Sequence, residues 1–228
     1  IYLFDVLVKR VAAKCLPGEF VIVKQDKQGE RIPLTICDYD REAGTVTIVI
    51  QVIGGSTKLI TEGLNEGDEF MDFVGPLGNP SDLISEDIEE LKKKKILFVA
   101  GGLGTAPVYP QVKWLFERGI KADVVQGAKS KDFVILEDEL KSVSDNLYVC
   151  TDDGSYGFKG LVTDKIKDLV ENEGKKYDHC VVIGPMIMMK FVALLTKELG
   201  IPTIASMNTI MVDGTGMCGA CRLSVGDE

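Results

Sequence analysis

The sequence predicts a two-domain α+β fold: an antiparallel β-barrel, a doubly wound parallel α/β domain, and then a C-terminal cysteine-containing loop. The first ~75 residues hold short runs rich in β-branched and aromatic residues, with no long helical pattern between them. From residue 95 onward, apolar runs alternate with helical patterns, which is typical of a parallel sheet covered by helices. Near the C-terminus, Cys218 and Cys221 form a C-x-x-C pair in a glycine-rich segment.

The barrel is predicted from strands at residues 20–23, 45–52 and 69–74. Their β-branched and aromatic residues suit a pleated, half-buried surface. Turn signals separate them, namely Pro17-Gly18, Gly54-Gly55 and Glu66-Gly67-Asp68. Because no long helix interrupts these strands, we expect them to close into one small antiparallel barrel.

The second domain is predicted from apolar strands that alternate with helices. The strands are expected at residues 96–100, 122–126, 147–150, 179–184 and 203–205, and the helices at 108–118, 161–172 and 190–199. We divide the chain into residues 1–90, 91–206 and 207–228. The lysine run at residues 92–95, near the first boundary, is interpreted as a solvated helix end.

Composition and charge exclude several classes of protein. The 228 residues suit one or two domains, and a net charge of −9 argues against a nucleic-acid partner, because phosphate binding needs a basic surface. No apolar run approaches the roughly 20 residues of a membrane span, and no signal peptide is recognisable. We therefore expect a cytoplasmic protein with no membrane partner. Since the chain opens without Met inside a strand-like pattern and stops just after the cysteine motif, we expect a fragment of a longer chain.

The remaining cysteines and the single histidine give no catalytic arrangement. Four cysteines are scattered singly, and we interpret them as reduced, buried, hydrophobic side chains: Cys15, Cys37, Cys150 and Cys180. The only histidine, His179, lies on a predicted strand and is interpreted as structural. No Ser–His–Asp or Cys–His arrangement can be proposed, so any redox chemistry must come from bound cofactors.

A glycine-rich turn follows the first predicted parallel strand and opens a helix. Glycines at such a turn let the backbone approach a pyrophosphate, and the helix N-terminus supplies amide donors. Three further loops follow later strands, where ligands of open α/β sheets bind, although each alone is equally consistent with an ordinary turn. The candidate nucleotide-binding residues are Gly101, Gly102, Gly104, Thr105, Ala106, Pro107, Gly127, Ala128, Asp152, Asp153, Gly154, Gly184, Pro185 and Met186.

Two segments of the barrel are candidates for a second ligand. In the run Arg31-Ile32-Pro33-Leu34-Thr35, a guanidinium can bind a pyrophosphate while a hydroxyl and backbone amides reach a ring edge. The run Gly54-Gly55-Ser56-Thr57 offers small residues and hydroxyls for phosphate. From the residues alone, an unliganded strand and turn explain both segments equally well.

The C-terminal segment has the spacing of a metal-cluster site. Plant-type [2Fe–2S] sites use C-x₄-C-x₂-C and a distant fourth cysteine, and this chain has the same spacing with Asp213 before Cys218 and Cys221. Zinc needs two further ligands, and a redox-active disulfide or a structural role also remains open. Asp213 is either a ligand or a turn residue, because aspartate before glycine is common in turns.

As an ordered set, these motifs resemble the ferredoxin-NADP reductase superfamily over the full length of the chain. Gly75-Pro76-Leu77-Gly78 and Gly184-Pro185-Met186 match as well. The resemblance is greatest to the branch with the electron-transfer subunit of NAD-dependent dihydroorotate dehydrogenase and the small subunit of NADH-dependent reduced ferredoxin:NADP oxidoreductase. Arg31 lies four residues before Thr35, unlike the R-x-Y-[ST] pattern of plant-type reductases, and Asp213 replaces a cysteine of the dihydroorotate-type subunits.

The resemblance implies an oxidoreductase that binds FAD in the barrel, NAD(H) in the sheet domain and a [2Fe–2S] cluster at Asp213, Cys218 and Cys221. It assigns Thr35 to the catalytic site and, to FAD, the residues Arg31, Ile32, Pro33, Leu34, Thr35, Val49, Ile50, Gln51, Gly55, Ser56 and Thr57. Electrons would pass to a larger flavin or iron–sulfur subunit and, through it, to ferredoxin. The resemblance favours a subunit of an electron-bifurcating, NADH-dependent ferredoxin:NADP oxidoreductase. The alternatives are the electron-transfer subunit of an NAD-dependent dihydroorotate dehydrogenase and a nucleotide-binding or redox-sensing module without turnover. Lys129 and Lys131 leave the choice between NAD and NADP open.

Overall fold

The computed structural model describes residues 1–207, 210–224 and 226, which form two compact units. The first contains Ile1–Ser81 and the described residues of the C-terminal segment, and the second contains Asp82–Met207. The chain thus divides earlier than the predicted boundary at residue 90. The reason is that residues 82–91 pack with the second unit, where Leu83 and Leu91 are buried.

The first unit is built on an antiparallel sheet of five strands within the described residues, in the order β1-β4-β3-β2-β5. The strands are β1 (Tyr2–Leu7), β2 (Phe20–Lys24), β3 (Ile32–Asp40), β4 (Thr45–Ile50) and β5 (Asp72–Leu77). Side chains from both edge strands, such as Phe4 of β1 and Phe73 of β5, pack against one buried cluster. The sheet therefore curls around a single core, although β1 and β5 remain its edges in the part of the chain that is described.

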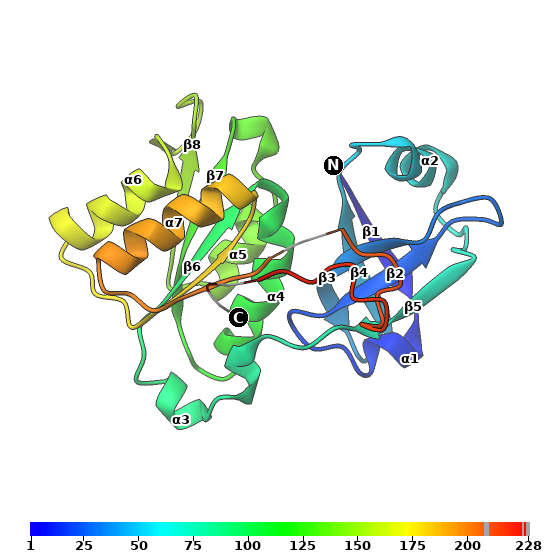
Figure 1. Cartoon of the computed structure of the whole chain (residues 1–228), viewed down its shortest axis with the longest axis horizontal. Helices are drawn as coiled ribbons and strands as arrows, with labels where there is room; N and C mark the ends of the chain where they lie inside the picture. Colours follow the sequence, from blue (N-terminus) through cyan, green and yellow to red (C-terminus); the bar gives the residue numbers. More distant parts are fainter. Residues whose placement is uncertain (208–209, 225, 227–228) are drawn as a thin grey trace. The chain divides into compact units, whose positions relative to one another are not determined.

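Two helices accompany this sheet, α1 (Lys9–Ala12) and α2 (Gly55–Gly63) (Figure 1). The sequence patterns predicted no long helix among the barrel strands, and the structure places a helix of nine residues, α2, between β4 and β5. Thr57 stabilises the N-terminus of α2, because its hydroxyl accepts hydrogen bonds from the N–H groups of Ile53 and Gly54, both at 3.1 Å. Ile60 then buries one side of the helix in the core.

The second unit is built on a parallel sheet of six described strands, in the order β11-β10-β6-β7-β8-β9. They are β6 (Ile96–Gly101), β7 (Ala122–Ala128), β8 (Asn146–Thr151), β9 (Phe158–Lys159), β10 (His179–Ile183) and β11 (Thr203–Ala205). The chain runs from β6 through β7 and β8 in one direction, then returns to place β10 on the other side of β6. This reversal is a topological switch point, where ligands of open α/β sheets bind.

Helices cover both faces of this sheet. On one face lie α6 (Val162–Lys167), which continues as a π-helical turn η4 (Asp168–Asn172), and α7 (Met186–Glu198). On the other lie α4 (Thr105–Phe116) and α5 (Glu137–Val143) (Figure 1). Short helical pieces complete the unit: η1 (Asp82–Ser85), α3 (Ile88–Leu91), η2 (Gly102–Gly104) and η3 (Lys131–Phe133).

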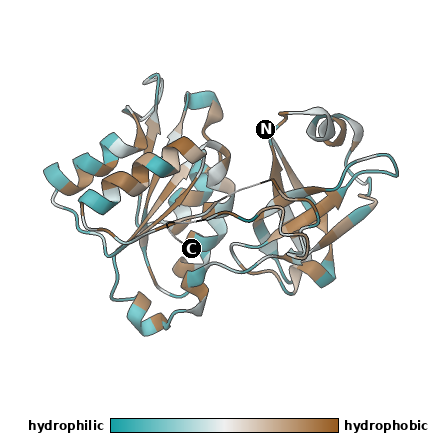
Figure 2. Ribbon diagram, in the orientation of Figure 1, coloured by the Kyte–Doolittle hydropathy of each residue, from teal (hydrophilic) through white to brown (hydrophobic). Residues whose placement is uncertain are grey.

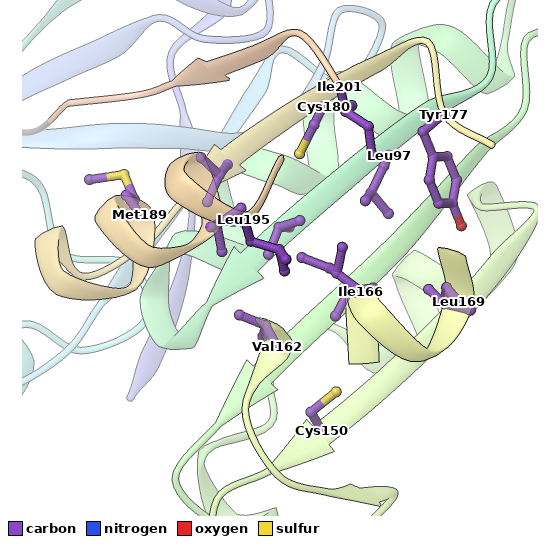
Figure 3. Close-up of a cluster of buried hydrophobic side chains, with 14 residues drawn as sticks. Leu97, Cys150, Val162, Ile166, Leu169, Tyr177, Cys180, Met189, Leu195 and Ile201 are labelled. Atoms are coloured by element: carbon purple, nitrogen blue, oxygen red, sulfur yellow. The ribbon is translucent and has the colours of Figure 1, made fainter. Parts of the chain in front are cut away.

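The core under α6 and α7 joins side chains of the central strands to both helices. Leu97 and Cys150 of the strands meet Ile166 of α6 and Leu195 of α7 (Figure 3). Figure 2 shows the strands of both sheets as predominantly hydrophobic, with hydrophilic stretches on the surface helices. Apolar burial on this scale is the main stabilising term of such a fold.

The predicted strands and helices of the second unit are confirmed, with shifted ends. Gly127 and Ala128, expected in a loop, are the last residues of β7, and Met186 is the first residue of α7. The four single cysteines are buried as expected, and burial raises the pKa of Cys15, Cys150 and Cys180 to about 12. Among the described residues, no helix has the length and apolar character to cross a membrane.

Candidate functional site

The predicted nucleotide-binding residues gather at one edge of the parallel sheet. Because all its strands are parallel, their carboxyl ends share an edge, and each predicted loop follows one of them. The glycine turn follows β6, and Pro185 caps α7 after β10. These two strands flank the switch point, so the backbone of both loops borders the crevice expected there.

Backbone packing explains the glycines at the switch point. A Cβ on Gly104 would lie 2.3 Å from the carbonyl oxygen of Ile183, and one on Gly184 would lie 3.0 Å from the Cα of Gly101. No side chain fits at such distances, so the two turns touch through their main chains. Gly102 differs: its φ is +53°, and a Cβ there would meet nothing within 4 Å. The turn thus keeps an open surface beside the first amides of α4, where a phosphate can bind.

Two further predicted loops lie along the same edge. The turn after β8 is ordered by Asp153, whose carboxylate accepts a hydrogen bond of 2.9 Å from the N–H of Ser155. This bond lowers the pKa of Asp153. Asp152 is tied to the end of β7, since its N–H donates to the carbonyl of Ala128 at 3.1 Å. A Cβ on Gly127 would lie 2.5 Å from Val162, so the packing of α6 by itself explains that glycine.

The predicted flavin residues of β3 divide between the two faces of the antiparallel sheet. Ile32 and Leu34 pack against the core cluster, and Pro33 and Thr35 therefore point to the opposite, outer face. Ile50 of β4 is 1% exposed within the core, so only its backbone can meet a ligand. In this structure, Pro33 and Thr35 are the side chains of the motif that a flavin on the outer face would contact.

The polar groups expected at the flavin pyrophosphate already have partners. Arg31 donates from Nε and Nη2 to one carboxylate oxygen of Asp72, at 3.2 and 2.7 Å. The hydroxyl of Ser56, in the first turn of α2, donates to the carboxylate of Glu30. Since Glu30 precedes Arg31, this bond places the N-terminus of α2 beside Arg31. The remaining guanidinium donors and the first amides of α2 can together hold a phosphate.

The outer face also carries the C-terminal cysteine segment. Phe20 lies opposite Thr35 and Ile22 opposite Pro33 in the β2–β3 pairing, so these four side chains share the outer face. A Cβ on Gly214 would lie 2.3 Å from Ile22 and 3.4 Å from Phe20. The loop that contains Asp213 therefore rests on the strand next to the flavin motif.

Within this loop, Asp213 organises the backbone. Its carboxylate accepts hydrogen bonds from the N–H of Thr215 at 2.9 Å and from that of Cys218 at 3.0 Å, and these bonds lower its pKa. Cys218 is exposed and Cys221 is half-buried. Among the described residues, no three His, Cys, Asp or Glu side chains converge as a metal-binding group. Thiolates are the usual ligands of iron–sulfur clusters, so Cys218 and Cys221 have donor chemistry that fits such a cluster.

Sequence and structure comparisons give relatives across most of the chain. The family described as the oxidoreductase NAD-binding domain matches residues 98–194. The "Uncharacterized protein in adh 3'region" of Clostridium beijerinckii is 62% identical over 228 residues, which is 100% of this chain and 77% of that protein. A Thermotoga maritima homologue of the dihydroorotate dehydrogenase B (NAD(+)) electron transfer subunit is 45% identical, over 96% of this chain and 73% of that protein.

The chain belongs to the dihydroorotate dehydrogenase B electron transfer subunit family, within the ferredoxin-NADP reductase superfamily. A solved structure of an NADH-dependent reduced ferredoxin-NADP oxidoreductase, described in the context of flavin-based electron bifurcation, has a TM-score of 0.83 and 43% identity. It covers 96% of this chain, which in turn covers 76% of it. As a member of this oxidoreductase family, the chain has its NAD-binding domain in the second unit, because residues 98–194 lie within Asp82–Met207.

Three residues next to the candidate site residues are not singled out by the sequence patterns: Phe20, Ile22 and Gln126. Phe20 and Ile22 were assigned to a strand without a face, although a strand that is apolar on both faces signals that both are covered. Gln126 lies in an otherwise apolar strand, and its buried amide donates to Thr105 Oγ1 at 3.3 Å and to the Ile135 carbonyl at 2.7 Å. A glutamine in a buried strand was the available signal.

Proposed function

We propose that this chain is an electron-transfer flavo-iron–sulfur subunit. It moves electrons between NAD(H), FAD and a [2Fe–2S] cluster to a larger oxidoreductase subunit, within an electron-bifurcating, NADH-dependent ferredoxin:NADP oxidoreductase. One observation carries the proposal: the cysteine loop rests, through Gly214, on the same face of the same sheet as Thr35 of the flavin motif. The relative with a bifurcating oxidoreductase structure, at 43% identity, supports this branch.

Each cofactor has residues suited to it. FAD would be held by the outer face of β3 and by the N-terminus of α2, with Thr35 able to hydrogen-bond the ring edge. NADH would bind at the switch-point turns after β6 and β10. Asp213, Cys218 and Cys221 would ligate the cluster together with a further ligand. The flavin supplies the exchange between two-electron and one-electron chemistry, and the chain supplies position, solvent exclusion and tuning.

The visible spectrum of the anaerobically purified full chain tests this function. We expect FAD that is released on denaturation, iron and sulfide in cluster stoichiometry, and bleaching of the flavin band on adding NADH. Cys218→Ser should lose iron and keep FAD, whereas Cys180→Ala, which alters a buried cysteine of β10, should keep both. FMN or no flavin in the extract, or iron retained in Cys218→Ser, would contradict the assignment.

Asp213 can act as a ligand or only as a turn residue, and substitution separates these roles. If the carboxylate is a ligand, Asp213→Cys keeps a [2Fe–2S] cluster with a shifted potential, because thiolate is a softer donor than carboxylate. Asp213→Ala should then change the electron paramagnetic resonance spectrum. An unchanged spectrum and potential in Asp213→Ala would assign to Asp213 only the two amide hydrogen bonds of the loop.

The second candidate is the electron transfer subunit of a dihydroorotate dehydrogenase, favoured by the name of the relative with 45% identity. Both candidates use the same cofactors and differ in the partner. Complexes reconstituted with the product of a neighbouring gene should oxidise NADH and reduced ferredoxin while reducing NADP in the first case, and should oxidise dihydroorotate while reducing NAD in the second. A nucleotide-binding module without turnover would show no absorbance change on anaerobic addition of NADH.

A further inference from the structure

The ring of Phe20 lies between two glycines that are far apart in the sequence. A Cβ on Gly78, just after β5, would lie 2.8 Å from Cε1 of the ring. A Cβ on Gly214, in the cysteine loop, would lie 3.4 Å from its Cε2. The two contacts involve opposite edges of the ring. Phe20 therefore fills the space between the end of β5 and the cysteine loop.

Neither glycine can be replaced without displacing its neighbour. Gly78 and Gly214 have φ values of +83° and +72°, which L side chains rarely adopt, and both Cβ positions are occupied. Contacts below 3.0 Å at Gly78 and at Gly214, the latter against Ile22, leave no room for a methyl group. This packing also gives a role to the last residue of the Gly75-Pro76-Leu77-Gly78 motif.

Phe20 is not one of the residues that form the core of its unit. The buried cluster contains Val21 and Val23 of β2, whereas Phe20 is half-buried on the outer face. Its cross-strand neighbours are Thr35 of β3 and Leu77 of β5. The ring of Phe20 lies on the outer face, with one edge on the cysteine loop and Thr35 beside it. Its role is therefore to orient the loop and not to fill the core.

We infer that Phe20 is a positioning residue that seats the cysteine loop on the outer face of β2, next to Thr35. The inference deepens the proposed function, because the seated loop would set the separation between flavin and cluster. Ile22 and the ring of Phe20 are the nearest neighbours of a Cβ on Gly214, so removing the ring takes away part of the apolar surface on which the loop rests.

Hydrogen–deuterium exchange of the full chain tests this seat without relying on activity. The reporters are the N–H groups of Thr215 and Cys218, which are protected by Asp213 while the loop is in place. Phe20→Leu keeps an apolar side chain but loses the ring, and Phe20→Ala extends the series if it folds. The matched control is Phe73→Leu, the same change on the same sheet, where the ring packs against the core instead.

We expect exchange at the two reporters to rise at least about tenfold in Phe20→Leu, and to remain near wild type in Phe73→Leu. Unchanged exchange in Phe20→Leu, or an equal rise in both variants, would overturn the inference. In a second measurement, EDTA should remove iron from anaerobically purified Phe20→Leu several-fold faster than from the control. If the wild-type chain holds no iron, the proposed function fails, while the exchange result still decides the role of Phe20.

Discussion

The switch-point turns of the parallel sheet meet through their backbone, whereas the outer face of the antiparallel sheet is formed by side chains. At the switch point, Gly104 and Ile183 touch through main-chain atoms, so the turn is set by strand order. On the outer face, the groups expected to hold FAD phosphates, Arg31 and Ser56, are already bonded to Asp72 and Glu30. If the proposed ligands bind there, the first surface needs no rearrangement of side chains, whereas side-chain ion pairs and hydrogen bonds surround the second.

This difference predicts that the two sites respond to different kinds of substitution. A site of backbone amides responds to changes of shape and hardly to changes of surface charge. A site of exposed ion pairs responds to charge and to salt, although each pair contributes little to stability. The four predictions below test this contrast, beginning with the largest effect.

Gly104→Ala should damage the crevice, because its new methyl group would lie 2.3 Å from the carbonyl oxygen of Ile183. We expect a loss of about 1–3 kcal/mol in the free energy of unfolding, together with loss of NADH binding. Gly55→Ala, at the start of α2, is the control, because a Cβ there meets nothing within 4 Å. Denaturant unfolding measures the stability of the two variants, and NADH titration measures their binding. Equal stability of Gly104→Ala and Gly55→Ala would contradict close backbone packing at Gly104.

NADH should reduce the flavin faster than NADPH, by roughly tenfold in single-turnover mixing. Lys131 lies over the ring of Tyr156 at 5.3 Å, and Tyr156 donates a hydrogen bond of 2.8 Å to Glu137. Bonds from Lys141 and Tyr156 lower the pKa of Glu137, and we expect this negative charge to disfavour a 2′-phosphate bound near Lys131. Glu137→Gln should reduce the ratio of the NADH rate to the NADPH rate. An equal or reversed preference in the wild-type chain would count against the branch assignment.

Thr35→Ala should weaken a hydrogen bond near the flavin ring at a cost of about 1 kcal/mol, and so slow reduction by NADH. Thr47→Ala makes the same change on neighbouring β4, where the hydroxyl donates to Asp5 instead. Stopped-flow absorbance at the flavin band compares the two variants. Wild-type kinetics in Thr35→Ala would remove this residue from the site.

Glu30→Gln should tighten FAD binding by less than about 1 kcal/mol, because it removes a negative charge beside the first turn of α2. Arg31→Ala should weaken binding by a similar amount. Both effects should shrink as salt is added. FAD titration of the apoprotein at low and high ionic strength measures them, and salt-independent affinities in both variants would show that side-chain charge does not shape this surface.

Local sequence patterns were enough to predict much of this molecule. The alternation of apolar strands and helices predicted the parallel sheet, and the turn before Thr105 was placed correctly after its first strand. Both depend on spacing along a few neighbouring residues. The motif from Arg31 to Thr35 was likewise found as a strand, but not the division of its side chains between two faces.

The sequence by itself determined the periodicities, the turn glycines and the cysteine spacing, since these are properties of adjacent residues. Only the tertiary structure decided that β2 presents Phe20 and Ile22 outward, that α2 interrupts the barrel strands, and that Gly214 rests on β2. A strand that is apolar on both faces carries no signal of which face meets the core. A contact between residues 20 and 214 depends on packing across nearly the whole chain, which no local pattern encodes.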